Sequence, residues 1–163
     1  MNKASKNIAW YEVFNKHYYH KWKSTPWKFQ QKLDNRIITA QQKLIERFGT
    51  MVLNDWYWGG NNDSRGWRPP EDPDGAEFSD HKYGRALDSV PQKITLKEIH
   101  LDIVKNPSFY LDIGITTIES IDYATSWLHI SNRWHIYDDI LVVEPSNSMK
   151  LKEYKEKIIK EMS

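Results

Sequence analysis

One stretch of apolar residues, between residues 29 and 48, constrains the fold of this chain more than any other part of it. The stretch is followed directly by Gly49, which can supply the left-handed residue that ends many helices. Its apolar positions recur in steps of three and four, the period of a helix with one buried face: Phe29, Leu33, Ile37, Ala40, Leu44 and Phe48. We therefore predict an amphipathic helix that runs to residue 48.

Other helices are predicted on both sides of this one. Aromatic and apolar residues between residues 10 and 18 also recur at helical spacing, so we expect a short amphipathic helix that ends before Pro26. The sequence TLKE at residues 95–98 is a capping box, which predicts a helix that stops near Asn106 and Pro107. From Met149 the chain is charged, and a frayed surface helix is expected there.

Most of the remaining periodic segments favour strands. They are joined by a long polar region after residue 58 that is rich in Gly, Pro, Asn and Asp, and loops of that length are commonly functional or disordered. The predicted strands cover residues 51–56, 85–90, 113–119, 127–131 and 140–143.

The order of these elements, helices first and then mostly strands, predicts the fold class. We expect an α+β fold in which N-terminal helices pack on a small antiparallel sheet. The length of 163 residues suits a single domain. We divide it into an aromatic helical segment over residues 1–27, a core over residues 28–145 and a charged tail over residues 146–163.

Composition excludes several classes of function. The chain has no cysteine, so disulfides and cysteine-based metal sites or nucleophiles are ruled out, and a metal site must use His, Asp and Glu. A formal net charge of +1 gives no reason to expect nucleic acid or an acidic membrane as a partner. No apolar run approaches the ~20 residues of a membrane helix. The basic N-terminus lacks the apolar stretch of a secretory signal, so we expect synthesis in the cytoplasm without export by that route.

The segment SDHKYGRALD, at residues 79–88, carries two residues that can bind a metal. Gly84 allows a sharp turn, and residues 85–88 are expected to be extended, so that Ala86 and Asp88 share one face. A turn between His81 and Asp88 can therefore bring an imidazole and a carboxylate to one point. Such a pair taken alone is more often chance surface polarity, because short motifs are weak signals.

A predicted hairpin near the end of the chain adds a second imidazole and a second carboxylate. In WLHIS, Leu128 and Ile130 face the core, so His129 points to the opposite side. Residues 120–126 can connect this strand antiparallel to the preceding one, which brings Glu119 near His129. Three protein ligands plus a water molecule are the pattern of a catalytic zinc site.

These motifs resemble a known family. The pattern S-x-H-x-x-G-x-A-x-D followed by a W-x-H strand is similar to that of the zinc D-alanyl-D-alanine carboxypeptidase superfamily, which includes phage endolysin peptidases and the hedgehog signalling domain. The resemblance covers roughly residues 28–145. It implies a hedgehog-like peptidase fold in which His81, Asp88 and His129 bind Zn²⁺. The element GWRPP resembles a family element that places Arg68 over the site.

The activity that this resemblance implies is zinc-dependent hydrolysis of peptide bonds in bacterial peptidoglycan. Glu119 would be the base that takes a proton from the attacking water, and Arg68 would stabilise the carbonyl oxygen or hold a substrate carboxylate. We expect Ser79, Trp67 and Trp127 to contact the stem peptide, which is the expected partner. The family also implies a phage or prophage protein that acts on the cell wall after release or as part of a virion.

Two departures from the family pattern leave an alternative open. Many members have H-x-D at the last ligand, whereas this chain has Ser131 in place of the aspartate; Ser126 stands where other members carry the base. Second carboxylates of this kind commonly tune metal affinity. The alternative is a weakly active or inactive module that serves as a structural or binding part of a virion, with virion proteins as partners. A dipeptidase of cell-wall recycling would share the same chemistry.

Simpler readings of single residues also remain open. His81 and Asp88 could simply bond to each other, Glu119 could be a solvated charge at a strand end, and Arg68 could pair with an acidic residue of the neighbouring loop. The sequence DWYWGG at residues 55–60 could form a platform for carbohydrate stacking; packing in the core beside the site is the preferred interpretation.

Overall fold

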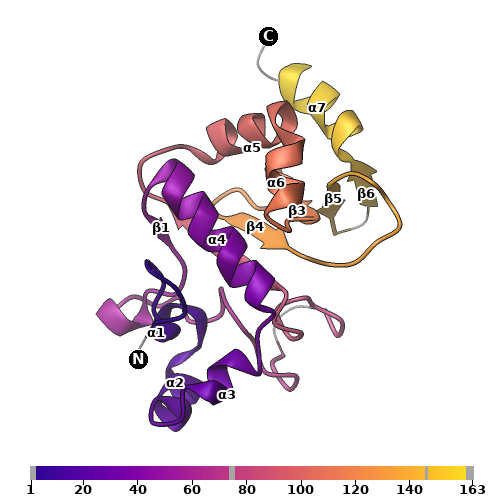
Figure 1. Cartoon of the computed structure of the whole chain (residues 1–163). Coiled ribbons are helices and arrows are strands. Elements are labelled where there is room, and N and C mark those ends of the chain that lie inside the picture. Colours follow the sequence, from indigo (N-terminus) through magenta and orange to yellow (C-terminus); the bar gives the residue numbers. More distant parts are fainter. Residues whose placement is uncertain (1–2, 74–75, 146, 161–163) are drawn as a thin grey trace.

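The computed structural model describes residues 3–73, 76–145 and 147–160, and its centre is a six-stranded mixed sheet (Figure 1). Seven α-helices occur among the described residues, of which α4 contacts β2 and α7 contacts β5 and β6. The strands lie in the order β1 (Met51–Val52), β2 (Ala86–Pro91), β4 (Leu128–Ser131), β3 (Thr117–Glu119), β5 (Leu141–Glu144) and β6 (Asn147–Lys150).

The predicted α+β class is confirmed at this level, but the sheet is not purely antiparallel. Strand β3 pairs in parallel with β5, while the other neighbouring pairs of the sheet are antiparallel. The reason is the connection over residues 132–140, which carries the chain from β4 past β3 to the far side of β3. After that crossing, β5 runs in the direction of β3. Strand β6, absent from the prediction, completes a hairpin with β5.

The long amphipathic helix begins later than the sequence pattern indicates. Helix α4 spans Asn35–Phe48, and the side chain of Asp34 caps it by accepting a hydrogen bond from the N–H of Arg36 at 3.0 Å. The first turn of the predicted helix is a separate short helix, α3 (Trp27–Gln30). Gly49 ends α4 with a φ of 85°, as predicted. The buried face of α4 lies against the sheet, where it contacts β2.

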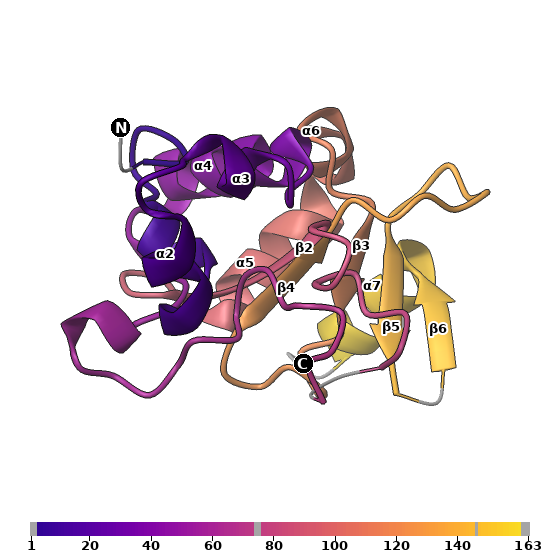
Figure 2. The same cartoon turned by 90° about the horizontal axis from the view of Figure 1, so that it is seen from below.

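The aromatic N-terminal segment forms two helices rather than one. Helix α1 (Trp10–Val13) ends before Asn15, whose side chain caps α2 (Lys16–Trp22) by accepting from the N–H of Tyr18 at 3.0 Å. Phe14 of this segment is fully buried and packs against four rings, those of Trp10, Trp22, Phe29 and Trp67. Figure 2 places α2 and the β5–β6 hairpin at opposite ends of the molecule.

The helices in the second half of the chain confirm the predicted capping box and show how the charged tail is packed. Helix α5 (Leu96–Lys105) opens with the predicted box of Thr95 and Glu98, and α6 (Pro107–Asp112), not predicted, follows it directly. The helix predicted for the charged tail is confirmed, but it is packed on a neighbouring helix rather than frayed. Helix α7 (Leu151–Lys160) packs on α5 and buries three of its side chains because they recur every three to four residues: Leu151, Tyr154 and Ile158.

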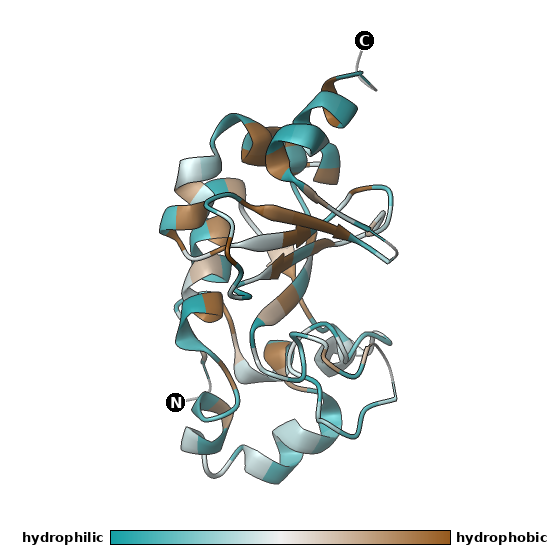
Figure 3. Ribbon diagram, turned by 90° about the vertical axis from the view of Figure 1, so that its right-hand side faces the viewer, coloured by the Kyte–Doolittle hydropathy of each residue, from teal (hydrophilic) through white to brown (hydrophobic). Residues whose placement is uncertain are grey.

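The hydrophobic residues concentrate in the strands and on the inward faces of the helices, as Figure 3 shows by colour. None of the helices in the described ranges is both long enough and apolar enough to pass through a bilayer.

Candidate metal centre

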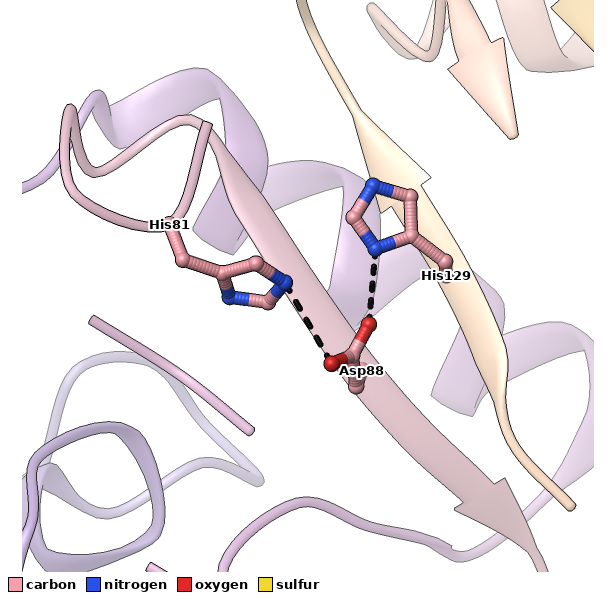
Figure 4. A group of neighbouring side chains, drawn as sticks. All are labelled: His81, Asp88 and His129. Carbon is pink, nitrogen blue, oxygen red and sulfur yellow. Dashed lines mark hydrogen bonds and ion pairs between the residues drawn. The ribbon is translucent and has the colours of Figure 1, made fainter. Parts of the chain in front are cut away.

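The three predicted ligands converge on one point. His81, Asp88 and His129 are all buried, and one potential ligand atom from each lies within 4.8 Å of the others. The His81 Nε2 atom lies 3.3 Å from Asp88 Oδ2, and the His129 Nδ1 atom lies 2.7 Å from Asp88 Oδ1. Figure 4 shows both rings directed at the two oxygens of the carboxylate between them. These residues could hold a metal ion.

Strand pairing places two of the ligands. Asp88 of β2 is the direct partner of His129 of β4 in the antiparallel ladder. Directly paired side chains on one face are close neighbours, so the register alone brings carboxylate and imidazole together. That register is fixed because Leu87 and Ile130, which alternate with the ligands, are fully buried on the other face.

A tight turn before β2 places the third ligand. Gly84 has a φ of 68°, a conformation that side chains rarely adopt, and a Cβ atom there would lie 1.9 Å from the backbone oxygen of Lys32. A glycine is therefore required at this position on two grounds. The turn lets the chain reverse between His81 and the start of β2, so that the imidazole of His81 faces Asp88.

The tautomer of His81 follows from its second nitrogen. Its Nδ1 lies 2.7 Å from the backbone oxygen of Gly66, and because a carbonyl only accepts, Nδ1 must donate the hydrogen. In the neutral ring, Nε2 is then an acceptor that faces another acceptor, the Asp88 carboxylate. A cation between them satisfies both. A backbone carbonyl that orients a metal-binding histidine in this way is a common feature of metal sites.

The pKa values of Asp88 and His129 are shifted in opposite directions, as expected for a carboxylate and an imidazole in contact. Burial raises the pKa of Asp88, but the charge of His81 and the hydrogen bond from His129 outweigh burial and hold this pKa below its usual range. Burial lowers the pKa of His129, whereas its hydrogen bond to Asp88 raises it, and the net pKa is raised. A metal ion would take the place of the proton that His129 shares with Asp88, since ligands bind metal deprotonated.

The donor set is compatible with a divalent metal ion. Two imidazole nitrogens and one carboxylate oxygen are a common set for catalytic zinc, and ligands about 2.0–2.1 Å from a tetrahedral ion lie ~3.4 Å apart. The contact of 3.3 Å between His81 and Asp88 matches this spacing, whereas the 2.7 Å hydrogen bond between His129 and Asp88 would have to lengthen to admit an ion. All three ligands line a cleft of about 870 Å³, so a fourth position can be reached from solvent.

The predicted general base, Glu119, and the predicted positively charged side chain, Arg68, both lie at this cleft. The β3–β4 register pairs Ile118 with Ile130, as the predicted antiparallel hairpin requires, and Glu119 Oε1 lies 3.9 Å from His129 Nδ1. Arg68 Nη2 lies 3.5 Å from Asp88 Oδ2, and its Nε donates to the backbone oxygen of Ser64 at 2.6 Å. The structure therefore places Glu119 and Arg68 beside the ligands.

Of the three residues predicted to contact substrate, two line the cleft and one does not. Ser79 and Trp127 are partly exposed on its wall. The prediction for Trp67 is wrong: its side chain is buried 5.5 Å from the ring of Phe14, ring centre to ring centre. The N–H of Trp67 donates to the backbone oxygen of Val13 at 2.9 Å, and this contact turns the ring into the aromatic core.

The sequence interpretation missed a buried carboxylate beside the ligands, that of Asp80. Its Oδ2 accepts the hydroxyl of Ser131 at 2.9 Å and Nε of Arg133 at 2.7 Å. Ser131 lies two residues after His129 in β4 and so shares its face, which is the signal that could have identified it; Arg133 follows just after the strand. Asp80 escaped notice because it occupies a variable position of the motif. Its charge is one of the causes that raise the pKa of His129.

No family model, no curated protein and no solved structure matches this chain. The geometry of the site is therefore the basis for its chemistry. That geometry comprises a buried three-ligand group open to a cleft, with Glu119 and Arg68 within reach of whatever occupies it.

Proposed function

We propose that this chain is a zinc-dependent peptidase that hydrolyses peptide bonds in the stem peptides of bacterial peptidoglycan, as a carboxypeptidase or an L-Ala–D-Glu endopeptidase. The observation that carries the proposal is the convergence of His81, Asp88 and His129 at a cleft that also holds Glu119. Zinc, when bound by these three residues, supplies Lewis acidity toward water and toward a carbonyl oxygen.

Glu119 is the residue suited to act as the general base. Its side chain is 19% exposed, so it reaches the cleft, and it approaches the ligands from β3 rather than from the strands that carry them. In the proposed reaction Glu119 accepts a proton from the attacking water and passes it to the leaving amine. Because Glu119 makes no contact closer than 3.9 Å to His129, its carboxylate is free to do so without losing a bond to the ligands.

Arg68 lies where its guanidinium can stabilise negative charge on a substrate. Its Nε is held by the backbone of Ser64, which leaves the Nη atoms directed to the ligand group. A guanidinium fixed in this way stabilises charge on a carbonyl oxygen, or holds a carboxylate through two parallel hydrogen bonds. Stem peptides carry carboxylates, and Arg133 offers a second cation at the same cleft.

The size of the cleft favours a peptide over a smaller substrate. Its volume of about 870 Å³ lies at the upper end of the usual range for binding sites, ~300–1,000 Å³. Two exposed aromatic side chains on its wall, Phe78 and Tyr123, offer apolar surface to a bound chain.

Incubation of the purified chain with peptidoglycan tests the proposal, with new amine termini as the readout. We expect release in the presence of zinc, its loss with a chelator, and a loss of at least ~100-fold in Glu119→Gln. Glu153→Gln, which changes an exposed carboxylate on α7, is the matched control and should leave the rate unchanged. Elemental analysis of His129→Ala should show loss of the metal. A folded, zinc-loaded protein that releases no amines would overturn the proposal.

A further inference from the structure

The loop after β1 presents two aromatic side chains to solvent. Tyr57 and Trp58, in the 3₁₀ turn η1 (Trp56–Trp58), are 52% and 59% exposed, so the preferred interpretation of DWYWGG as core packing is wrong for these two residues. Trp56 does anchor the turn, because its Nε1 donates to the backbone oxygen of Phe14 at 3.0 Å. The turn projects at the outer edge of the molecule (Figure 2, at the left).

The exposed rings are held in fixed orientations. The ring of Tyr57 stacks on Tyr11 with centroids 4.0 Å apart and an interplanar angle of 11°, and the ring of Trp58 stands perpendicular to Tyr11. Stacked and edge-on pairs of this kind restrict the orientation of both rings. Exposed aromatic surface that is held rigidly away from the core is typical of a binding site.

Hydrogen bonds close the loop below these rings. The carboxylate of Asp55 accepts from the N–H of Asn62 at 2.8 Å and from its Nδ2 at 2.6 Å, and the N–H of Asp55 donates to the backbone oxygen of Asn62 at 2.9 Å. The segment between them is thereby fixed as a closed loop. A surface that is already ordered loses little conformational entropy when a ligand binds.

A polar groove leads from this loop to the candidate metal centre. The chain continues from Trp58 into residues 61–64, whose amide, carboxylate and hydroxyl groups line a groove of about 360 Å³. The groove ends at Arg68, Asp88 and Trp127, and these three residues also line the cleft of the metal centre. The groove and the cleft are therefore continuous, and the exposed rings belong to the same loop, a few residues before the groove residues in the chain.

We propose that the aromatic platform (Tyr57 and Trp58) and the groove of residues 61–64 bind the glycan strand of peptidoglycan while the stem peptide occupies the cleft. The substrate class rests on the proposed peptidase function. A pyranose ring has an apolar C–H face that can stack on an aromatic ring, and stacking of this kind tolerates different sugars. The hydroxyl and acetamido groups of N-acetylhexosamines match the amide of Asn61, the amide oxygen of Asn62 and the carboxylate of Asp63.

Titration of the full chain with N-acetylglucosamine tetrasaccharide, followed by calorimetry, tests the proposal. We expect saturable binding, weakened about tenfold or more in Trp58→Ala and largely retained in Trp58→Tyr, since about 1–3 kcal/mol of stacking is lost only in the first variant. Trp134→Ala removes another exposed tryptophan, one that is 80% exposed and lies outside the groove, and should bind like the parent chain. Cellotetraose, which lacks acetamido groups, should bind more weakly.

Two rates separate this proposal from the peptidase function. On whole peptidoglycan, Trp58→Ala should be slower; on stem peptides without glycan it should equal the parent chain. Hydrolysis of free peptides with no tetrasaccharide binding would overturn the platform and leave the peptidase standing. Binding of tetrasaccharide without hydrolysis of either substrate would leave the platform and overturn the peptidase. Sedimentation that shows a dimer dissociated by Trp58→Ala, together with no sugar binding, would assign these rings to self-association instead.

Discussion

The backbone oxygen of Gly66 lies 2.7 Å from Nδ1 of His81, and this single bond decides which nitrogen of His81 faces the cleft. Gly66 itself has no space for a side chain. A Cβ atom there would lie 1.9 Å from the backbone oxygen of Val13. The loop that orients His81 is thus pressed against the N-terminal aromatic segment, and the position of that segment is linked to the metal centre.

The first prediction concerns this link. Gly66→Ala must displace the loop from Val13 and shift the carbonyl that holds His81, so we expect zinc affinity to fall by about 10–100-fold, the usual effect of losing such an orienting contact. Competition with a chromogenic chelator measures this directly. Gly114→Ala is the control: its φ of 88° also disfavours a side chain, but its nearest neighbour would be 3.9 Å away, and it lies outside the site. Equal zinc affinities in the two variants would contradict the prediction.

The second prediction concerns Ser131. Asp80 already supplies a buried carboxylate at this position, with its Oδ2 atom 2.9 Å from the Ser131 hydroxyl. Ser131→Asp would place two carboxylates in contact, and we expect the free energy of unfolding to fall by about 2–3 kcal/mol. Urea titration at pH 7.5 is the measurement.

A double variant makes this second prediction specific. Ser131→Asn has the same size as Ser131→Asp without the charge and should be the more stable of the two. Asp80→Asn combined with Ser131→Asp moves the carboxylate from one side of the contact to the other. This double variant should recover most of the free energy of unfolding that Ser131→Asp loses. Failure of the double variant to recover stability would show that size rather than charge causes the effect.

The third prediction concerns metal binding and stability. A ligand that binds only the folded state stabilises it by RT ln(1 + [L]/Kd), or about 2.7 kcal/mol at a hundredfold excess over Kd. Zinc should therefore raise the unfolding temperature in thermal scans, and magnesium should not, because magnesium prefers oxygen ligands. Asp88→Asn, which keeps the size of the side chain, should abolish most of the zinc-dependent shift. A shift of the same size in this variant would locate zinc elsewhere.

The parts of the site that the sequence predicts are those fixed by alternation in strands. Alternation assigns His129 to the face opposite Leu128 and Ile130, and Asp88 to the face of Ala86, a rule that can be read without a structure. The pairing of β2 with β4, which makes Asp88 and His129 direct neighbours, is seen only in the structure. Glu119 follows from the same rule through the β3–β4 register. His81 was found because the short distance to Asp88, with Gly84 between, leaves few ways for the chain to turn.

Residues whose placement depends on long-range packing could not be predicted in this way. Trp67 lies in the motif GWRPP, yet its ring joins the aromatic core because of a backbone contact with Val13, more than fifty positions earlier. The parallel pairing of β3 with β5 depends on the path of a loop, which has no periodic pattern. Asp80 became visible only when the strand pairing brought Ser131 and Arg133 to it.

The fourth prediction concerns His100, a buried histidine away from the metal centre. Its Nδ1 lies 2.9 Å from the hydroxyl of Tyr154, and its Nε2 is buried without a hydrogen-bond partner among the described residues. Burial lowers the pKa of His100 to about 4, and the nearby carboxylate of Asp122 opposes this only weakly. The cause is the cost of placing a charge between α5 and α7, where little else can solvate it.

The sign of the pH effect follows from the two pKa values of His100. Above pH 6.5 the ring is neutral in both states and has no effect on stability. Between pH 6.5 and about 4 the unfolded chain binds a proton that the folded chain does not, so the free energy of unfolding falls as the pH falls. Over the full range this loss amounts to about 3 kcal/mol.

Urea titrations between pH 7.5 and 4 of the parent chain and His100→Gln measure this contribution. The variant cannot be charged, so its stability should fall less steeply with acid, even where it is less stable at pH 7.5 because the packing has changed. His20→Gln, which removes an exposed histidine on α2, should keep the slope of the parent chain. Parallel stability curves for the parent chain and His100→Gln would mean that the buried ring accepts its proton as readily in the folded state as in the unfolded one.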